Sequence, residues 1–245
     1  MHPCGLRARG FRSSMQAFFR LLKRLLLIAF ALLLSYQGWL FGWVMWWKYH
    51  PPQETHFMAI RLAELREKNP QAKLQYQWVP YEKISSHLKR AVVASEDDKF
   101  MEHNGFDWDG IEYALKKNQR KGKKVAGGST ITQQLAKNLF LSPSRSYLRK
   151  LQEAIITVML ESLWDKHRIL EVYLNVVEWG NGVFGAEAGA RRQFGQSAAS
   201  LSDYQAVHMA VMLPSPRRFE KGLPPYVVEH AQSVAERMRY SQVPR

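Results

Sequence analysis

Residues 25–47 form a stretch of 23 residues without a single charged side chain. At about 1.5 Å of rise per residue, a helix of this length would cross a hydrocarbon core of roughly 30 Å. Tryptophans crowd the C-terminal half of the stretch, as in an aromatic belt at a membrane surface: Trp39, Trp43, Trp46 and Trp47. The sequence therefore predicts a single transmembrane helix over residues 25–47.

The charges on either side of this stretch are unequal. Six basic and no acidic residues precede it, whereas residues 48–66 contain three basic residues. Because basic residues favour the cytoplasmic side, we expect a cytoplasmic basic tail over residues 1–24 and an extracytoplasmic domain over residues 48–245. A cleaved signal peptide is the alternative, but it would need a small-residue cleavage site, and bulky residues follow Gly38. An uncleaved anchor is therefore favoured.

The composition limits the partners of the exported part. Its residues include 29 basic and 21 acidic side chains, a net charge of +8, and the one cysteine, Cys4, lies in the predicted tail. Neither a disulfide nor a cysteine-based metal site can form in residues 48–245. Nucleic acid is a poor partner for an exported domain. Anionic lipid head groups, a lipid pyrophosphate or an acidic wall polymer fit the charge better.

Helical periodicity dominates residues 48–245. We expect a short helix from Thr55 to Lys68, an extended piece over residues 76–80, and a mobile basic loop from Lys116 to Lys124. Three further apolar stripes have helical spacing: Ile84, Leu88, Ala91 and Val92; Ile111, Ala114 and Leu115; and Leu148, Leu151, Ile155, Val158 and Met159. Since strand signals are few and no internal repeat is found, the predicted fold class is mostly α.

Residues 127–138 read Gly-Gly-Ser-Thr-Ile-Thr-Gln-Gln-Leu-Ala-Lys-Asn. The two glycines permit a sharp turn or a close approach to a ligand, and Ser129 and Thr130 are natural helix caps. The polar residues that follow lie one turn apart in pairs: Gln133 with Lys137, and Gln134 with Asn138. Such a helix start suits a polyhydroxylated, anionic ligand. A capped helix with a solvated polar face is the alternative.

Three adjacent carboxyl groups, those of Glu96, Asp97 and Asp98, follow a predicted helix. Their mutual repulsion favours a raised pKa for the most buried of them, and such a carboxylate makes a good general base for a hydroxyl group. An acidic helix end is the alternative. We predict a structural role for the neighbouring His103. The spacing of Glu96, Asp98, Glu102 and His103 fits no closed metal site, so no metal ligands are assigned.

A second charged group lies at Arg149, Lys150 and Glu153, where both cations share a helical face with the carboxylate. Arg145 lies one turn upstream, and Lys137 of the preceding helix could join the group. Such cations would stabilise negative charge that grows on a departing phosphate. A surface ladder of ion pairs is the alternative.

Five segments resemble, in the expected order, the motifs of the bacterial peptidoglycan glycosyltransferases, glycosyltransferase family 51. The first four are residues 96–107, 127–138, 149–153 and 166–175. The fifth is Phe194-Gly195 with the helix that ends at Leu213-Pro214-Ser215-Pro216, although Gln193 stands where the family usually has an aromatic residue. The resemblance covers roughly residues 80–220. It implies a lysozyme-like fold, and we interpret Glu171, Asn175 and Glu178 of the fourth region as scaffold.

The resemblance also implies an activity and the residues that carry it. Glu96 would deprotonate the 4-hydroxyl of lipid II, which then displaces pyrophosphate from the growing chain and forms a β-1,4 glycan. Glu153 is the second catalytic candidate. The candidate substrate-binding residues are Ser129, Thr130, Gln133, Gln134, Lys137, Asn138, Arg145, Arg149 and Lys150. A divalent cation, Mg or Mn, could accompany the pyrophosphate.

The resemblance places the enzyme in the bacterial inner membrane, with wall-synthesis or cell-division proteins as partners. Ser86-His87-Leu88-Lys89 matches the Ser-x-x-Lys pattern of transpeptidases, but no Lys-Thr-Gly or Lys-Ser-Gly follows it. We therefore expect a monofunctional enzyme. Two alternatives are weighed: a lysozyme-like hydrolase or lytic transglycosylase, which needs neither lipid anchor nor cation cluster, and a non-enzymatic scaffold, which gives the clustered polar residues no role.

Overall fold

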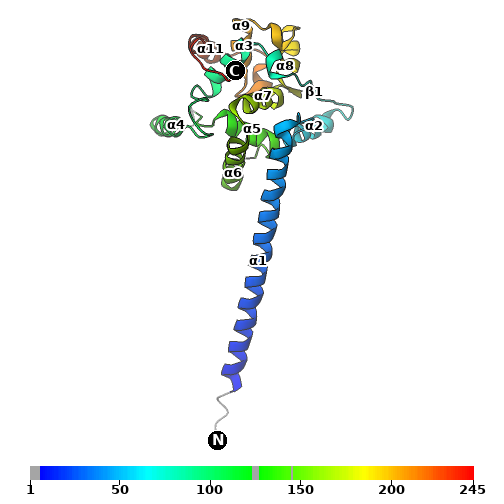
Figure 1. Ribbon diagram of the computed structural model, residues 1–245, viewed down its shortest axis with the longest axis vertical. Coiled ribbons are helices and arrows are strands. Elements are labelled where there is room, and N and C mark those ends of the chain that lie inside the picture. Colours follow the sequence, from blue (N-terminus) through cyan, green and yellow to red (C-terminus); the bar gives the residue numbers. More distant parts are fainter. Residues whose placement is uncertain (1–5, 123–126, 145) are drawn as a thin grey trace. The chain divides into compact units, whose positions relative to one another are not determined.

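The computed structural model describes residues 6–122, 127–144 and 146–245. Its α-helices are, in chain order, α1 (Leu6–Tyr49), α2 (His56–Lys68), α3 (Ser86–Glu96), α4 (Trp108–Lys121), α5 (Ile131–Phe140), α6 (Tyr147–Leu163), α7 (Lys166–Val176), α8 (Ala186–Phe194), α9 (Asp203–Met212), α10 (Pro216–Phe219) and α11 (Pro225–Arg237). Short 3-10 helices cover Tyr81–Lys83 and Ala198–Ser200. The predicted mostly α fold is confirmed (Figure 1).

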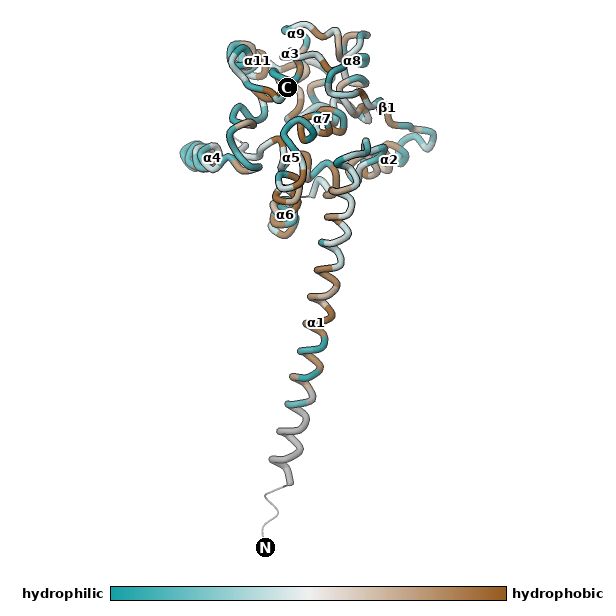
Figure 2. The backbone as a smooth tube through the Cα atoms, viewed as in Figure 1, coloured by the Kyte–Doolittle hydropathy of each residue, from teal (hydrophilic) through white to brown (hydrophobic). Residues whose placement is uncertain are grey.

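The chain forms two compact units, Met1–Met45 and Trp46–Arg245. Within the first unit, α1 exposes large apolar side chains, including Leu26, Phe30 and Leu32. Figure 2 shows brown, hydrophobic stretches of this helix between paler and teal ones. Across the described ranges of the chain, no helix combines the length and the apolar character needed to cross a membrane. The predicted span at residues 25–47 is therefore not confirmed.

The second unit is built around α5 and α7, which pack against each other, while α6 packs on α5 and α9 packs on α3 (Figure 1). The apolar stripe of α5, Ile131, Leu135 and Leu139, is buried, as predicted from its spacing. The stripe that ends in α3 is also confirmed, since Leu88 and Val92 are fully buried.

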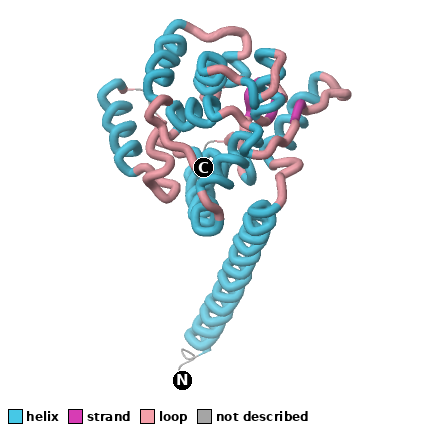
Figure 3. The backbone as a smooth tube through the Cα atoms, turned by 45° about the horizontal axis from the view of Figure 1, so that its top comes forward, coloured by secondary structure: helices cyan, strands magenta, loops and turns pink. Residues whose placement is uncertain are grey.

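The predicted strand content is small, and three short strands are present: β1 (Gln75–Tyr76), β2 (Glu178–Gly180) and β3 (Val183–Phe184). They form one sheet in the order β1-β3-β2, in which β1 is parallel and β2 antiparallel to β3. Figure 3 marks strand residues in magenta among the helices, which are cyan. Asn175 bonds both backbone groups of Val79, donating to its carbonyl at 2.9 Å and accepting from its N–H at 3.0 Å. The extended piece predicted at residues 76–80 is thereby held against α7.

The loop predicted from Lys116 to Lys124 is wrong over its first part, because Lys116–Lys121 belongs to α4. Asp107 caps this helix by accepting from the backbone N–H of Gly110, and the helix ends at Gly122, whose φ is 61°. A dense run of cations had suggested a loop, but the cap, the ion pair between Glu112 and Lys116 and this glycine C-cap specify a helix. Lys123 and Lys124 lie outside the described residues.

The helix predicted from the apolar stripe of residues 148–159 is confirmed as α6, but most of this stripe does not face the core. Leu148, Leu151 and Val158 are exposed by 80%, 61% and 54%, whereas the buried residues of the helix are Glu153, Ile156, Thr157 and Leu160. The helix packs against α5 through the face that carries Glu153, so the predicted stripe lies on the opposite side. A charged residue therefore occupies the inner face, and an apolar row faces outward.

Candidate active site

Asp97 fastens the end of α3 to the start of α5. Its Oδ2 accepts a hydrogen bond from the Ile131 N–H at 3.0 Å. His103 accepts at Nδ1 from the Gly105 N–H at 3.1 Å, so its Nε2 carries the proton and donates to Asp97 Oδ1 at 2.8 Å. The carboxylate also lies at the positive end of a helix dipole. His103 has the structural contacts predicted for it, and Glu96 is held at a fixed place beside α5.

The start of α5 is a capping box. The Thr130 hydroxyl accepts from the Gln133 N–H at 3.2 Å, and the Gln133 side chain accepts from the Thr130 N–H at 3.1 Å. Thr130 also donates its hydroxyl proton to the Gly105 carbonyl at 2.7 Å. The cap predicted at this position is confirmed at Thr130. These bonds show that both side chains shape the loop from residue 127 as well as facing the cavities described below.

Glu96 has the environment of a general base. Its Oε2 accepts a hydrogen bond from Gln134 Nε2 at 2.6 Å. Burial raises the pKa of Glu96, and the neighbouring Asp97 raises it further, while the Gln134 hydrogen bond and the charge of Lys137 act in the opposite direction. A carboxylate whose pKa is raised holds a proton more tightly once it has taken one.

Lys137 lies one turn after Gln134 on α5. Among the described residues it has no ion-pair partner, although it is only partly exposed. Burial lowers the pKa of Lys137, and Glu153 and Glu96 oppose this effect while Arg149 and Lys150 add to it. A cation that has lost water without gaining a bonded carboxylate is well suited to an anionic ligand.

The inner face of α6 carries a buried carboxylate between two cations. Glu153 accepts from Arg149 Nη1 at 2.6 Å and from Lys150 Nζ, and Lys150 also donates to the Ser129 hydroxyl at 3.2 Å. Arg149 Nε is buried and, within the described part of the chain, has no hydrogen-bond partner. The predicted group of Arg149, Lys150 and Glu153 is therefore assembled, with one donor left unused.

Two cavities meet at Glu96. The larger, about 520 Å³, is lined by Glu96 and by the groups on α5 and α6, including Lys137, Arg149 and Glu153. The smaller, about 160 Å³, is also lined by Glu96, together with Asp98, Asp107 and Arg237 among others. Ser129 lines both. A third cavity of about 380 Å³ shares Gln134, Lys137 and Arg149 with the larger one and reaches Asn138.

These geometric features agree with the comparisons with known proteins. A family model described as Transglycosylase matches residues 63–239. The chain belongs to this transglycosylase family. Proteins named "Biosynthetic peptidoglycan transglycosylase" are similar to it over most of their length. The one from Azoarcus sp. (strain BH72) is 62% identical over 230 residues, which cover 94% of this chain and 100% of the relative.

Two further relatives carry the same name. The protein of Aromatoleum aromaticum is 59% identical over 221 residues, 90% of this chain and 96% of the relative. The protein of Dechloromonas aromatica is 63% identical over 202 residues, 82% of this chain and 87% of the relative. The family match includes every residue of the two cavities that meet at Glu96.

The three cavities described above are lined by nearly all the candidate residues that the sequence indicated. Glu96, Ser129, Gln133, Gln134, Lys137, Arg149, Lys150 and Glu153 line the larger cavity, Thr130 the smaller one, and Asn138 the third. Arg145 lies outside the described residues. Sequence reasoning missed Tyr173, which is fully buried on α7 and contacts Gln134. The sequence did contain a signal for this residue: a tyrosine within an apolar helical run is expected to be buried, and a buried hydroxyl needs a hydrogen-bond partner.

The fourth and fifth motif regions differ in their relation to the larger cavity. Glu171 accepts from the Tyr81 N–H at 3.1 Å, and Asn175 holds Val79, which agrees with a scaffold role. Leu213 and Pro214 of the fifth region line the larger cavity. Gln193, the residue that departs from the family pattern, has a buried Nε2 without a hydrogen-bond partner among the described residues.

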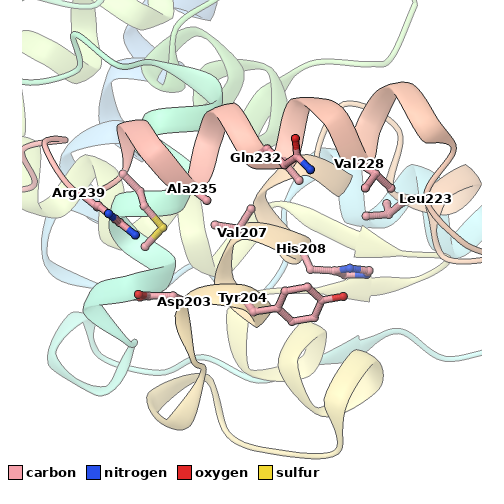
Figure 4. A pocket seen from close by; sticks show the side chains of 11 residues that line it. Asp203, Tyr204, Val207, His208, Leu223, Val228, Gln232, Ala235 and Arg239 are labelled. Atoms are coloured by element: carbon pink, nitrogen blue, oxygen red, sulfur yellow. The ribbon is translucent and has the colours of Figure 1, made fainter.

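An apolar pocket of about 410 Å³ lies elsewhere, between α9 and α11 (Figure 4). Its polar groups include His208, whose pKa is lowered by burial, and Asp203, which is paired with His87. Its lining includes one carboxylate, Asp203, and one arginine, Arg239, but no group of cations like that of α5 and α6. In the part of the chain that the structure describes, no group of three His, Cys, Asp or Glu side chains could hold a metal ion.

Proposed function

We propose that this chain polymerises lipid II into β-1,4-linked glycan and releases undecaprenyl pyrophosphate, as the family resemblance implies. The observation that carries the proposal is the larger cavity. It brings a carboxylate with a raised pKa, Glu96, into one space with the cations Lys137, Arg149 and Lys150. A base and a separate anion-binding group are what transfer from a pyrophosphate donor to a hydroxyl acceptor requires.

Glu96 would act on the acceptor. Its carboxylate takes the proton of the 4-hydroxyl of lipid II, and the oxygen forms a bond to the anomeric carbon of the growing chain. The bond from that carbon to the pyrophosphate breaks, and its electron pair leaves with the pyrophosphate. Attack from the opposite face converts an α-linked donor into a β-linked product. The donor needs little acid catalysis, since pyrophosphate is a good leaving group.

The cations of α5 and α6 would bind the pyrophosphate. Lys137 has no ion-pair partner among the described residues, and Glu153 would hold Arg149 and Lys150 in position. Ser129, Gln133, Gln134 and Asn138 would contact the sugars from the cavity walls, Thr130 would shape the loop, and Arg145 stays a predicted contact. A divalent cation enters this proposal only as an ion carried by the pyrophosphate.

The experiment that tests the function uses the purified full-length chain with labelled lipid II and a gel that resolves glycan chain lengths. We expect lipid-linked glycan to lengthen as lipid II is consumed, and moenomycin to block the reaction if the family resemblance holds. Shortening of preformed glycan without consumption of lipid II would instead assign the chain to the hydrolase class. Binding without either reaction would assign it a scaffold role.

A membrane setting belongs to the same proposal, with a lysozyme-like catalytic domain over residues 48–245 and an anchor over residues 25–47. Two observations support it: the uncharged 23-residue stretch lies within one helix, and α6 exposes apolar side chains on the helix that also carries Arg149 and Lys150. Such a face would let the cavity take a lipid-linked substrate from a bilayer surface. Wall-synthesis or cell-division proteins are the proposed partners.

The proposed topology has a direct test. A reporter that is active only outside the cytoplasm should be active when fused after Arg245 and inactive when fused before Met1, because the charge asymmetry places the N-terminus in the cytoplasm. Recovery of the chain in the soluble fraction after alkaline carbonate extraction would contradict the anchor. Activity of the N-terminal fusion would contradict its orientation.

The exposed face of α6 has a separate test. Leu148→Ser with Leu151→Ser should raise the KM for lipid II in vesicles about threefold to tenfold, which corresponds to a loss of about 1 kcal/mol of membrane contact by two exposed leucines. The melting temperature should not fall, because both side chains are exposed. Tyr226→Ser with Val228→Ser on α11 is the matched control, with exposed apolar residues outside the site cavities. An unchanged KM for the α6 variant would refute membrane contact by this face.

A further inference from the structure

Three side chains from three helices form a chain of hydrogen bonds that ends on the proposed base. Tyr173 of α7 donates its hydroxyl proton to Gln134 Oε1 at 3.0 Å. Gln134 of α5 donates from Nε2 to Glu96 Oε2, at the end of α3, at 2.6 Å. We propose that Tyr173 is a positioning residue, which fixes the Gln134 amide so that its N–H aims at Glu96. This inference rests on the proposed role of Glu96 as base.

The Tyr173 hydroxyl decides which way the amide faces. An amide has a donor end and an acceptor end, and a phenol that donates must face the acceptor end. With the amide reversed, its oxygen would lie against a carboxylate oxygen, and two acceptors at that distance repel. Tyr173 is fully buried, and burial together with the charges of Glu96 and Asp97 raises its pKa well above the ordinary value. The phenol therefore keeps its proton and remains a donor.

The amide N–H favours the ionised form of Glu96. Burial raises the pKa of this carboxyl group, and the hydrogen bond from Gln134 is the largest opposing effect, ahead of the charge of Lys137. Loss of a fixed amide orientation would therefore raise the pKa further. The other titratable or charged groups that face Glu96 or line its two cavities are Asp97, Asp98, Asp107, Arg149, Lys150, Glu153 and Arg237. None of them donates a hydrogen bond to Glu96 in the described structure.

Tyr173→Phe removes the hydroxyl and keeps the ring. Because Glu96 must be ionised to accept a proton, kcat/KM rises with pH through its pKa. We expect Tyr173→Phe to move this acidic limb upward by about 0.5 to 1 pH unit, which lowers kcat/KM below the limb by about threefold to tenfold. Well above the limb the rate should approach that of the wild type.

Gln134→Met tests whether the two residues act as one unit. It keeps the length of the side chain and removes both hydrogen bonds. Gln134→Met alone should move the limb upward at least as far as Tyr173→Phe, and adding Tyr173→Phe to it should produce no further movement. A further movement of the same size in the double variant would overturn the proposal.

Tyr81→Phe is the matched control. Tyr81 is also buried, and its hydroxyl donates to the Pro244 carbonyl at 2.7 Å, away from the cavities at Glu96. Both phenylalanine variants should lose some thermal stability, but only Tyr173→Phe should move the acidic limb. A Tyr173→Phe enzyme with a lower melting temperature and an unmoved limb would show a purely structural role. Activity of Glu96→Gln would instead refute the base assignment, which separates the two failures.

Discussion

Glu96→Gln should reduce the rate of glycan polymerisation by about 100-fold to 10,000-fold, the usual effect of removing a general base. Glutamine is nearly isosteric with glutamate, and its oxygen can still accept the hydrogen bond that Gln134 donates at 2.6 Å. Lipid II should therefore still bind, while the acceptor hydroxyl keeps its proton. Single-turnover measurements with labelled lipid II separate the two steps, since binding remains and chemistry is lost.

The stability of this variant should change in the opposite direction from its activity. The folded-state pKa of Glu96 is raised, mainly by burial, so the folded protein holds the proton more tightly than the unfolded chain does. The ionised form therefore costs stability as the pH rises above the unfolded pKa of about 4.3. Glu96→Gln removes this cost, and its melting temperature at neutral pH should equal or exceed that of the wild type.

Glu112→Gln is the control for a lost carboxylate. Glu112 is exposed on α4, pairs with Lys116 and lines neither cavity at Glu96. The control should keep both rate and melting temperature, because an exposed pair contributes little. Near-normal polymerisation by Glu96→Gln would falsify the base assignment and leave the family membership intact. A lowered melting temperature would mean that the lost rate reflects a disturbed fold.

Much of the site could be predicted because local signals and tertiary packing agree there. The stripe of Ile131, Leu135 and Leu139 and the cap at Thr130 specify α5 within one short segment, and the structure has both. The cap residue, the spacing of the apolar residues and the preceding glycine turn all indicate that a helix starts here. The polar residues of α5 therefore had to lie on a face next to the apolar stripe. The placement of Lys137 next to Gln134 follows from that local geometry.

The orientation of α6 could not be predicted in the same way. Leu148, Leu151 and Val158 have the spacing of a core stripe, yet the helix buries Glu153 and Thr157. Periodicity shows which residues share a face, but not which face meets the neighbouring helix. The two cations that pair with Glu153 offset the cost of its burial. A buried carboxylate on the inner face thus departs from the usual rule that apolar residues face the core.

The hydrogen bonds between distant segments also could not be predicted from the sequence. Tyr173 and Gln134 are 39 positions apart, and Gln134 and Glu96 are 38 apart. No local pattern links them, because each belongs to a different helix. The sequence supplied the residue types of the site, and packing of α3, α5 and α7 supplied their partners.

Lys137→Ala should lower kcat and kcat/KM together, by about 100-fold to 1,000-fold, as is typical when one donor to a developing negative charge is removed. Lys137 is the cation of the larger cavity that has no ion-pair partner among the described residues, and it faces both Glu96 and Glu153. Its interaction would strengthen as charge grows on the departing pyrophosphate. The effect should therefore appear in the chemical step and not in KM alone.

The stability of the Lys137→Ala variant distinguishes a catalytic role of Lys137 from a structural one. Burial lowers the pKa of Lys137, so the charged form is disfavoured in the fold, and its removal should leave the melting temperature unchanged or higher. Lys150→Ala should also lose rate, and Glu153 would retain Arg149 as a partner at 2.6 Å. Lys116→Ala on α4 removes the same charge from a residue that lines neither cavity at Glu96, and it should keep full activity. If Lys137→Ala lost stability while its rate stayed normal, the cation would be a structural element, and the pyrophosphate would have to be bound by Arg149 and Lys150 alone.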